Sequence, residues 1–379
     1  MFDFKGIKQA KSQKEIPTDN NGIPYIVQST TNNMCSRYVN RQYLVDINEP
    51  PVSGNAIVLG VTLPAVSYQP KEFGASQVIE ARSRFLNEKN GLFFAILISK
   101  QMYQFSYQNK PGIEIYKSLK IQLPLKENAL DFSNPCDNIK NIDFDFMESF
   151  IRELEEERIR ELNAYLLATG LKDYTLTPKE ENALEAFKTV QWGEFEFKQI
   201  FNNIKQGRRL KKEDQKEGTI PFVMSGTTNT GVVGYISNPV ASFPSNSITV
   251  DIFGNTFYRN FDFGAGDDTG VYWNDKENYS KDEMLFFTAA MGKSLFGKFD
   301  YGNKLRSSQS FDIKMQLPTK NNKPDYATME TFIKAVEKLV IKDVVLYADS
   351  KIETTKTVVK KDFEYKINED AGLLNVAEK

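Results

Sequence analysis

An internal duplication is the feature of this chain that most constrains its fold. Residues 22–33 read Gly-Ile-Pro-Tyr-Ile-Val-Gln-Ser-Thr-Thr-Asn-Asn, and residues 218–231 read Gly-Thr-Ile-Pro-Phe-Val-Met-Ser-Gly-Thr-Thr-Asn-Thr-Gly. Further matches follow in the same order: 2–5 with 195–198, 55–57 with 246–248, 92–94 with 285–287, 105–110 with 299–304, 120–124 with 314–318 and 147–151 with 329–333. The period is far too long for a solenoid, so we expect a duplicated pair of domains.

Each unit begins with a strand-rich part. The runs predicted as strands are bounded by Gly, Asn, Ser and Pro, and they are 23–27, 56–61, 93–98, 220–224 and 247–253. Segments 92–99 and 284–290 fit short helices equally well, because periodicity does not separate the two structures in short apolar runs.

Each unit ends in an amphipathic helix. The residues predicted on the packing face of these helices are Met147, Phe150, Ile151, Leu154, Arg158 and Leu162 in the first, and Met329, Phe332, Ile333, Val336, Val340 and Val344 in the second. Asp145 and Asp325 are the expected N-caps, and Gly170 is the expected end of the first helix. Two such helices from duplicated units are expected to pack antiparallel about a pseudo-two-fold axis.

The predicted fold class is therefore α+β, with two tandem α/β domains joined by two long antiparallel helices. The predicted segments are 1–125 for the first domain, 140–170 for its helix, 171–190 for a connector, 191–318 for the second domain, 325–348 for its helix and 349–379 for a tail with no assigned role. Within the connector, Thr177 and Pro178 are the predicted cap and first residue of a short helix.

The composition excludes several kinds of chemistry. The 379 residues contain no histidine and only two cysteines, which removes histidine-based nucleophilic catalysis, imidazole zinc sites and a disulfide framework. A formal net charge of −2 excludes a globally basic binder but not local basic clusters. There is no signal pattern and no apolar run long enough to span a bilayer, so we expect a cytoplasmic protein without membrane contact.

Three motif-like segments carry little weight. Pro324-Asp325 with Glu364 and Lys366 fits a nuclease pattern only formally, because Asp325 is already explained as a cap. In Asn48-Glu49-Pro50-Pro51, Glu49 interrupts a methyltransferase-like motif. The glycine-rich segment 264–270 lacks the lysine and helix of a phosphate loop and is expected to be a turn. We therefore expect a chain that is not an enzyme.

The repeated order of motifs resembles the specificity (S) subunits of restriction–modification systems, both Type I and Type IIB. The carriers are Gly-x-Ile-Pro-Phe-Val-x-Ser-x-Thr-x-Asn-x-Gly at 218–231, the strand at 246–250, Lys-Met-Gln-Leu-Pro at 314–318 and the Met-Glu-x-Phe-Ile helix. The resemblance implies two target-recognition domains that each read half of a split site in double-stranded DNA. It also implies helices that set the half-site spacing and dock two methyltransferase subunits, with a restriction subunit as a further partner.

The resemblance places no cofactor in this chain, since S-adenosylmethionine and magnesium would belong to the partner subunits. The first unit departs from the pattern at Met34-Cys35, where the second has Gly231-Val232. The predicted helices are shorter than those of a Type I subunit, which leaves Type I and Type IIB open.

The candidate DNA-binding residues fall in three sets. Basic residues for phosphate contacts are Lys5, Lys8, Lys11, Lys205, Arg208, Arg209, Lys211 and Lys212; polar loop residues are Ser29, Thr30, Thr31, Asn32, Asn33, Ser225, Thr227, Thr228 and Asn229; further base readers are Arg82 and Arg84. The polar loops are equally well explained as ordinary turns. A duplicated module that binds carbohydrate or protein is the alternative function.

Overall fold

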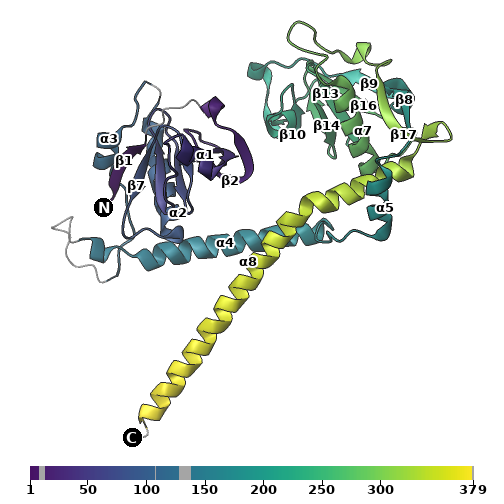
Figure 1. The fold of residues 1–379 in the computed structure, drawn as a ribbon. Helices are drawn as coiled ribbons and strands as arrows, with labels where there is room; N and C mark the ends of the chain where they lie inside the picture. The colour runs from purple at the N-terminus through teal and green to yellow at the C-terminus, as the bar shows by residue number, and fades with distance from the viewer. Residues whose placement is uncertain (8–12, 107, 128–137, 378–379) are drawn as a thin grey trace. The chain divides into compact units, whose positions relative to one another are not determined.

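The computed structural model describes residues 1–7, 13–106, 108–127 and 138–377. Its contacts divide the chain into two units, Met1–Leu162 with Thr354–Lys379, and Asn163–Glu353 (Figure 1). The elements that begin in the first unit are β1 (Asp3–Ile7), β2 (Thr18–Ile26), β3 (Cys35–Val39), α1 (Arg41–Asp46), β4 (Ala56–Gly60), β5 (Val66–Gln69), β6 (Gly74–Ala75), β7 (Val78–Arg82), α2 (Glu88–Gln101), α3 (Ile113–Ser118) and α4 (Phe144–Ala168).

The first unit is built on an antiparallel sheet with strand order β1-β7-β4-β5. All five residues of β4 are buried, because β4 is a central strand with both faces covered. Helix α2 packs against this sheet, and its Phe94 joins Ile57 and Leu59 in the main core cluster. A smaller sheet, β3-β2-β6, stands beside it.

The second unit repeats this design. Its elements are α5 (Pro178–Ala186), β8 (Trp192–Glu196), α6 (Phe197–Ile200), β9 (Asn203–Gln206), β10 (Glu217–Val223), β11 (Val232–Ile236), β12 (Ser242–Phe243), β13 (Ser247–Asp251), β14 (Thr256–Arg259), β15 (Phe263–Ala265), β16 (Thr269–Trp273), α7 (Lys281–Leu295), β17 (Lys314–Lys320), β18 (Lys323–Pro324) and α8 (Tyr326–Ala377). The order β14-β13-β16-β9 matches the main sheet of the first unit, and β11-β10-β15-β12 matches the smaller one.

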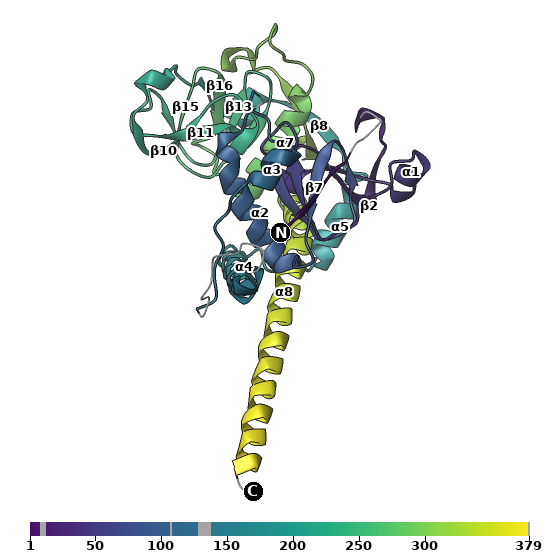
Figure 2. The same cartoon turned by 90° about the vertical axis from the view of Figure 1, so that its left-hand side faces the viewer.

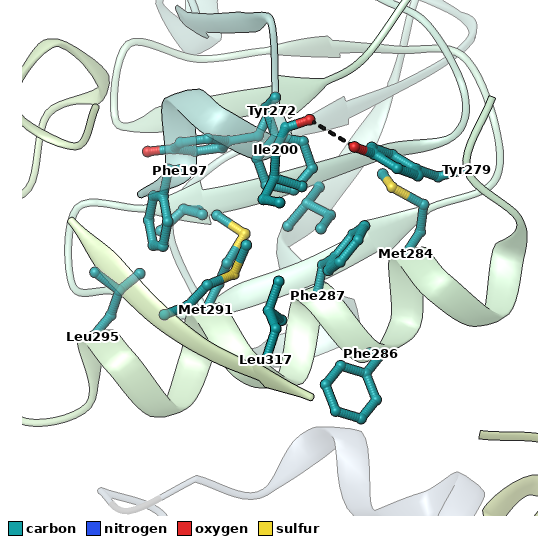
Figure 3. Packing of buried hydrophobic residues seen from close by; sticks show 14 of the residues in the cluster. Phe197, Ile200, Tyr272, Tyr279, Met284, Phe286, Phe287, Met291, Leu295 and Leu317 are labelled. Carbon is teal, nitrogen blue, oxygen red and sulfur yellow. Dashed lines mark hydrogen bonds between the residues drawn. The ribbon is translucent and has the colours of Figure 1, made fainter. Parts of the chain in front are cut away.

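Helix α7 supplies much of the second core. Met284, Phe287 and Met291 are buried there beside Tyr272 of the sheet (Figure 3). The Tyr279 hydroxyl donates to the carbonyl of Ile200 at 3.2 Å, so α6 is tied to the segment that leads into α7. This packing decides the ambiguous segments 92–99 and 284–290, which are helical, and the prediction of a strand at 93–98 is wrong.

The repeat is confirmed at the level of single side chains. Asn55 and Asn246 both adopt left-handed φ, 54° in each case. Tyr68 donates to Asn55 Oδ1 at 2.9 Å, and Tyr258 donates to Asn246 Oδ1 at 3.1 Å. The repeated Asn-x-Ile motif is therefore a turn that precedes a buried strand, tied to the neighbouring strand by a tyrosine.

One of the sequence matches, 2–5 with 195–198, does not correspond to equivalent structure. Strand β1 pairs with β7 as β9 pairs with β16, whereas 195–198 spans the end of β8 and the start of α6. Lys5 pairs with β7 at the position where Lys205 pairs with β16, so the two lysines are equivalent in the repeat. The reason is that the short Phe-acid-Phe-Lys pattern fits either strand, and only the hydrogen-bonded register separates them.

Helix α4 (Phe144–Ala168) lies within the predicted segment 140–170, but its cap is two residues earlier than predicted. Asp143, not Asp145, accepts the hydrogen bond from the backbone N–H of Phe146, at 2.8 Å. Met147 and Ile151 are buried, Leu154 is half-buried and Phe150 remains 46% exposed. The prediction for Gly170 is confirmed, because its φ of 74° follows the last helical turn.

The predicted connector lies along the first half of α8. Lys172 forms an ion pair with Asp349, Lys338 bonds Glu180 at 3.0 Å, and the ring of Phe187 stacks on Phe332 with centroids 3.7 Å apart. From Lys172 to Phe187 the connector contacts residues of α8 in descending order, from Asp349 to Phe332. The two segments are therefore antiparallel. Thr177 caps α5 as predicted, with Glu180 completing the capping box.

Helix α8 continues far beyond residue 348 and includes most of the predicted tail (Figure 1). Figure 2 shows its C-terminal part, in yellow, clear of other elements. Asp325 is its cap, as predicted, accepting from Thr328 N at 3.2 Å. Met329 is buried, and Phe332, Ile333 and Val336 are half-buried.

The predicted packing face of α8 is wrong beyond Val336. Val340 is 73% exposed and Val344 is 38% exposed, whereas Val345 and Ala348 are fully buried. The buried face of this part of α8 lies beside the ion pair of Lys172 and Asp349. It contains Val345, one residue after the predicted Val344. The antiparallel pairing of the two long helices stays a prediction.

Candidate nucleic-acid interface

A basic segment leaves the edge of the second main sheet. Lys205 on β9 holds its ammonium 5.3 Å from the centroid of the Trp273 ring. The backbone N–H groups of Gly207 and Arg208 then donate to Thr269 and Ala265, each at 2.9 Å. A Cβ at Gly207 would lie 2.1 Å from the carbonyl oxygen of Gly266, so only glycine permits this approach.

The side chains that follow this glycine project into solvent. Arg208, Arg209, Lys211 and Lys212 are all exposed, and Lys211 lies 3.7 Å from Glu213. Two open grooves of about 670 and 760 Å³ flank them, and Arg209 lines both. The arrangement is a cationic ridge between two hollows, which suits contact with an extended polyanion.

The repeated polar motif forms a second exposed loop, which we call the motif loop and define as Ser225–Gly231. Its start is tied to buried Asp251, whose Oδ2 accepts from Ser225 Oγ and Gly226 N, each at 3.1 Å. Asn229 bonds the carbonyl of Val232 at 3.2 Å. The interpretation as a turn is thus confirmed for Ser225 and Asn229, while the side chains of Thr227 and Thr228 remain exposed at the tip.

Hydrogen bonds gather these loops at one end of the second unit. Ile252, which follows Asp251, donates from its backbone to Asp268 at 3.0 Å and accepts from the backbone of Leu305 at 2.9 Å. Gln206 Nε2 donates to the carbonyl of Asp267 at 3.0 Å, and Ser307 N donates to Gln206 Oε1 at 2.8 Å. The basic ridge, the motif loop and the segment around Leu305 therefore belong to one surface.

Sequence reasoning missed an exposed aromatic loop beside this surface. Phe296 is 88% exposed and Tyr301 is 82% exposed, and Lys304 holds its ammonium 4.2 Å from the Tyr301 ring centroid. Asp300 fixes the loop by accepting from the backbone N–H groups of Gly302 and Asn303. The signal for this loop in the sequence is the repeat of 105–110 in 299–304, which contains Tyr301 and Lys304.

The first unit contains fewer described counterparts of this surface. Lys5 is exposed and lies 3.9 Å from Glu80, while Lys8 and Lys11 lie outside the described residues. Ser29 and Thr31 bond each other. Asn32 and Asn33 donate to the carbonyls of Cys35 and Tyr68 at 2.8 and 3.1 Å, which again explains the asparagines as turn residues. Thr30 is exposed.

The structure gives Arg82 a different role from the one predicted. Its guanidinium bonds Glu80 at 2.7 Å and the carbonyls of Ser53 and Gly54. These contacts use the group to hold a turn of its own domain, so Arg82 is not among the residues we propose for DNA. Arg84 is exposed and lies over the ring of Phe85, with its Cζ 4.7 Å from the centroid.

The described residues show no group of three or more His, Cys, Asp or Glu arranged to hold a metal ion. The glycine-rich segment 264–270 contains the end of β15, the predicted turn at 266–268 and the start of β16. Tyr272 is fully buried, and burial raises the pKa of its phenol to about 12, so it is neutral core material. No helix in the described part of the chain combines the length and apolar character needed to cross a bilayer.

The fold defines a class of protein in which one α/β domain and the long helix that follows it occur twice. The family model for the Type I restriction modification DNA specificity domain matches residues 1–164 and again 189–346. The chain belongs to this family, as a specificity subunit with two such domains. The resemblance predicted from the repeated motifs is therefore confirmed.

The chain is also similar to individual proteins. The specificity subunit S.BcgI of the Type II restriction enzyme BgcI from Heyndrickxia coagulans is 26% identical over 355 residues, covering 90% of this chain and 93% of the relative. The S subunit of a Type I restriction–modification system from M. genitalium is 14% identical, with 94% and 91% of the chains covered and a TM-score of 0.48. The HsdS subunit from Thermoanaerobacter tengcongensis is 12% identical, with 86% and 84% covered and a TM-score of 0.31.

Proposed function

We propose that this subunit reads a bipartite site in double-stranded DNA, one half-site per domain. The single observation that carries the proposal is the exposed cationic ridge of Arg208, Arg209, Lys211 and Lys212 beside the motif loop, on a domain that occurs twice. Lysine and arginine side chains would neutralise phosphates, and the loop tips would reach base edges. Duplication fits this task because a split asymmetric site needs two similar readers.

We further propose that the two long helices dock methyltransferase subunits, two per complex. Helix α8 leaves large apolar side chains exposed within the second unit, among them Val340, Leu346 and Tyr347. Apolar side chains of this size in a row mark a surface that a partner covers. S-adenosylmethionine and magnesium would then reside in the partner chains, with a restriction subunit as a further component.

The test is purification of the full chain together with the protein encoded beside it, followed by mapping of methylated bases in host DNA. The expected result is a complex that marks adenine within a split motif. A partner with methyltransferase and nuclease parts in one chain would indicate the Type IIB arrangement, and separate chains would indicate Type I. If the chain does not bind DNA at low salt and no methyltransferase co-purifies with it, the proposal is wrong. A duplicated carbohydrate- or protein-binding module would then be the better account.

A further inference from the structure

A buried cation lies directly beneath the motif loop. Arg259 on β14 is only 1% exposed. Its Nε donates to Thr249 Oγ1 at 3.0 Å, Nη1 donates to Thr230 Oγ1 at 2.9 Å, and Nη2 donates to the Thr230 carbonyl. One guanidinium thus holds both the backbone and the side chain of a single loop residue.

The residue that Arg259 holds is in a costly conformation. Thr230 has a φ of 52°, and Asn229 before it has a φ of 47°. A β-branched side chain rarely adopts left-handed φ, because its Cβ crowds the backbone, and such residues persist only where their surroundings hold them. The two bonds from Arg259 supply that restraint at one end of the loop, as Asp251 does at the other.

In the first unit, a neutral side chain holds the corresponding loop residue. Gln69 follows Tyr68 as Arg259 follows Tyr258, and its Nε2 donates to the carbonyl of Asn33 at 3.0 Å. Asn33 has a φ of 49° and occupies the position of Thr230 in the repeat. A neutral amide therefore suffices to hold this turn, so the positive charge in the second unit needs a separate explanation.

Among the described residues, the charge of Arg259 has no carboxylate partner. No oxygen of a described Asp or Glu lies within ion-pair distance of its guanidinium, which bonds two threonines and lies over the ring of Phe257, with its Cζ 5.4 Å from the centroid. Burial lowers the pKa of Arg259 to about 10, which still leaves the group charged at neutral pH. A buried cation without a counter-ion destabilises the fold, and an anion brought close to it recovers part of that cost.

We infer that Arg259 is a positioning residue whose uncompensated charge draws a DNA backbone phosphate onto the motif loop. The phosphate would lie against the exposed tip at Thr227 and Thr228, and the guanidinium beneath would act through a medium that screens poorly. The inference rests on the proposed function and deepens it. It makes phosphate binding at this loop stronger in the second domain than in the first.

The first test compares Arg259→Gln with Arg259→Lys in the full chain. The probe is a labelled duplex carrying the target found by methylation mapping, and binding is measured across a salt series. Gln keeps a donor for the Thr230 carbonyl, as Gln69 does, but loses the charge. The slope of log affinity against log salt should become shallower by about 0.9 for Gln and remain as in the wild type for Lys.

A surface variant tests the inference without disturbing the core. Thr228→Asp places an anion at the loop tip, with Thr228→Asn as the neutral control. The aspartate should raise the melting temperature of the free protein by giving Arg259 a counter-ion, and it should weaken binding of the duplex. Neither change is expected for the asparagine.

The results separate the role of Arg259 from DNA binding by the chain as a whole. If the wild type binds the duplex and Arg259→Gln shows the same salt slope, the inference is wrong and the proposed function stands. If Thr228→Asp leaves the melting temperature no higher than Thr228→Asn does, the inference is again wrong. If the wild type shows no salt-dependent binding, the proposed function fails and the inference fails with it.

Discussion

At the scale of single residues, the repeated motifs combine structural and exposed positions. Asn246 and Tyr258 hold a turn against its neighbouring strand, and Asn229 closes the motif loop on its own backbone. Thr227 and Thr228, in the same motif, have exposed side chains. The repeated motifs therefore chiefly determine turn geometry. Under the proposed function, the residues that contact DNA would be those whose side chains the turns do not use.

Loss of the Tyr258 hydroxyl should weaken the second domain measurably. Tyr258→Phe removes the 3.1 Å bond to Asn246 Oδ1 and leaves a half-buried amide oxygen without that partner. We expect a loss of about 1 kcal/mol in the free energy of unfolding, measured by urea titration. Tyr235→Phe is the matched control, because Tyr235 is 59% exposed and should tolerate the same change.

Replacing Arg208 and Arg209 together with glutamine should weaken DNA binding because both guanidinium groups are exposed on the ridge. Each lost phosphate contact is expected to make the salt slope shallower by about 1. The control is Lys276→Gln with Lys323→Gln, which removes the same charge from residues that line neither groove. Equal weakening by both double variants would show that only net charge matters.

At the scale of elements, each long helix is fastened to its domain in the same way. Met147 and Met329 are both fully buried. A lysine on α2 or α7, half-buried Lys89 or exposed Lys281, reaches a glutamate on the following long helix, Glu155 or Glu337. Buried apolar contact outweighs a solvent-exposed ion pair in such a joint, since water and salt screen the charges.

The two kinds of contact should differ clearly in a stability measurement. Met329→Ala is expected to cost about 2–5 kcal/mol, because it leaves a cavity where the helix meets the second core. Glu337→Gln should change the unfolding free energy by less than about 1 kcal/mol. A larger effect from Glu337→Gln than from Met329→Ala would contradict this account.

The stability of the connector should depend on pH through Glu180. The backbone N–H of Thr177, with Lys338, holds the pKa of Glu180 below its ordinary value of 4.5. Its contribution to stability is therefore present above pH 4.5 and is lost as the pH falls through the lower folded-state pKa. The melting temperature of the wild type should exceed that of Glu180→Gln at neutral pH, and the gap should close in acid.

At the scale of the whole molecule, the duplication supplies two recognition domains that differ in their loops. The main sheets share strand order and register, yet Gln69 stands in one where Arg259 stands in the other. A common frame with different loops lets each domain read its own half-site under the proposed function.

Exchange of the first domain should therefore change one half of the target and leave the other half and the spacing intact. The measurement is methylation mapping of a chain in which residues 1–125 come from a related subunit of different specificity. A change in both half-sites, or in the spacing between them, would contradict independent reading by the two domains.

The sequence by itself determined the duplication, the α+β class, the turns and the caps at Thr177 and Asp325, because these depend on local backbone preferences and on a repeated order of motifs. Tertiary structure decided the rest. The register that makes β1 the counterpart of β9, the buried face of α8 and the place of Arg259 beneath the motif loop all depend on contacts between residues far apart in the chain. Such contacts leave no periodic trace in a single sequence, since any apolar or cationic side chain of suitable size can make them.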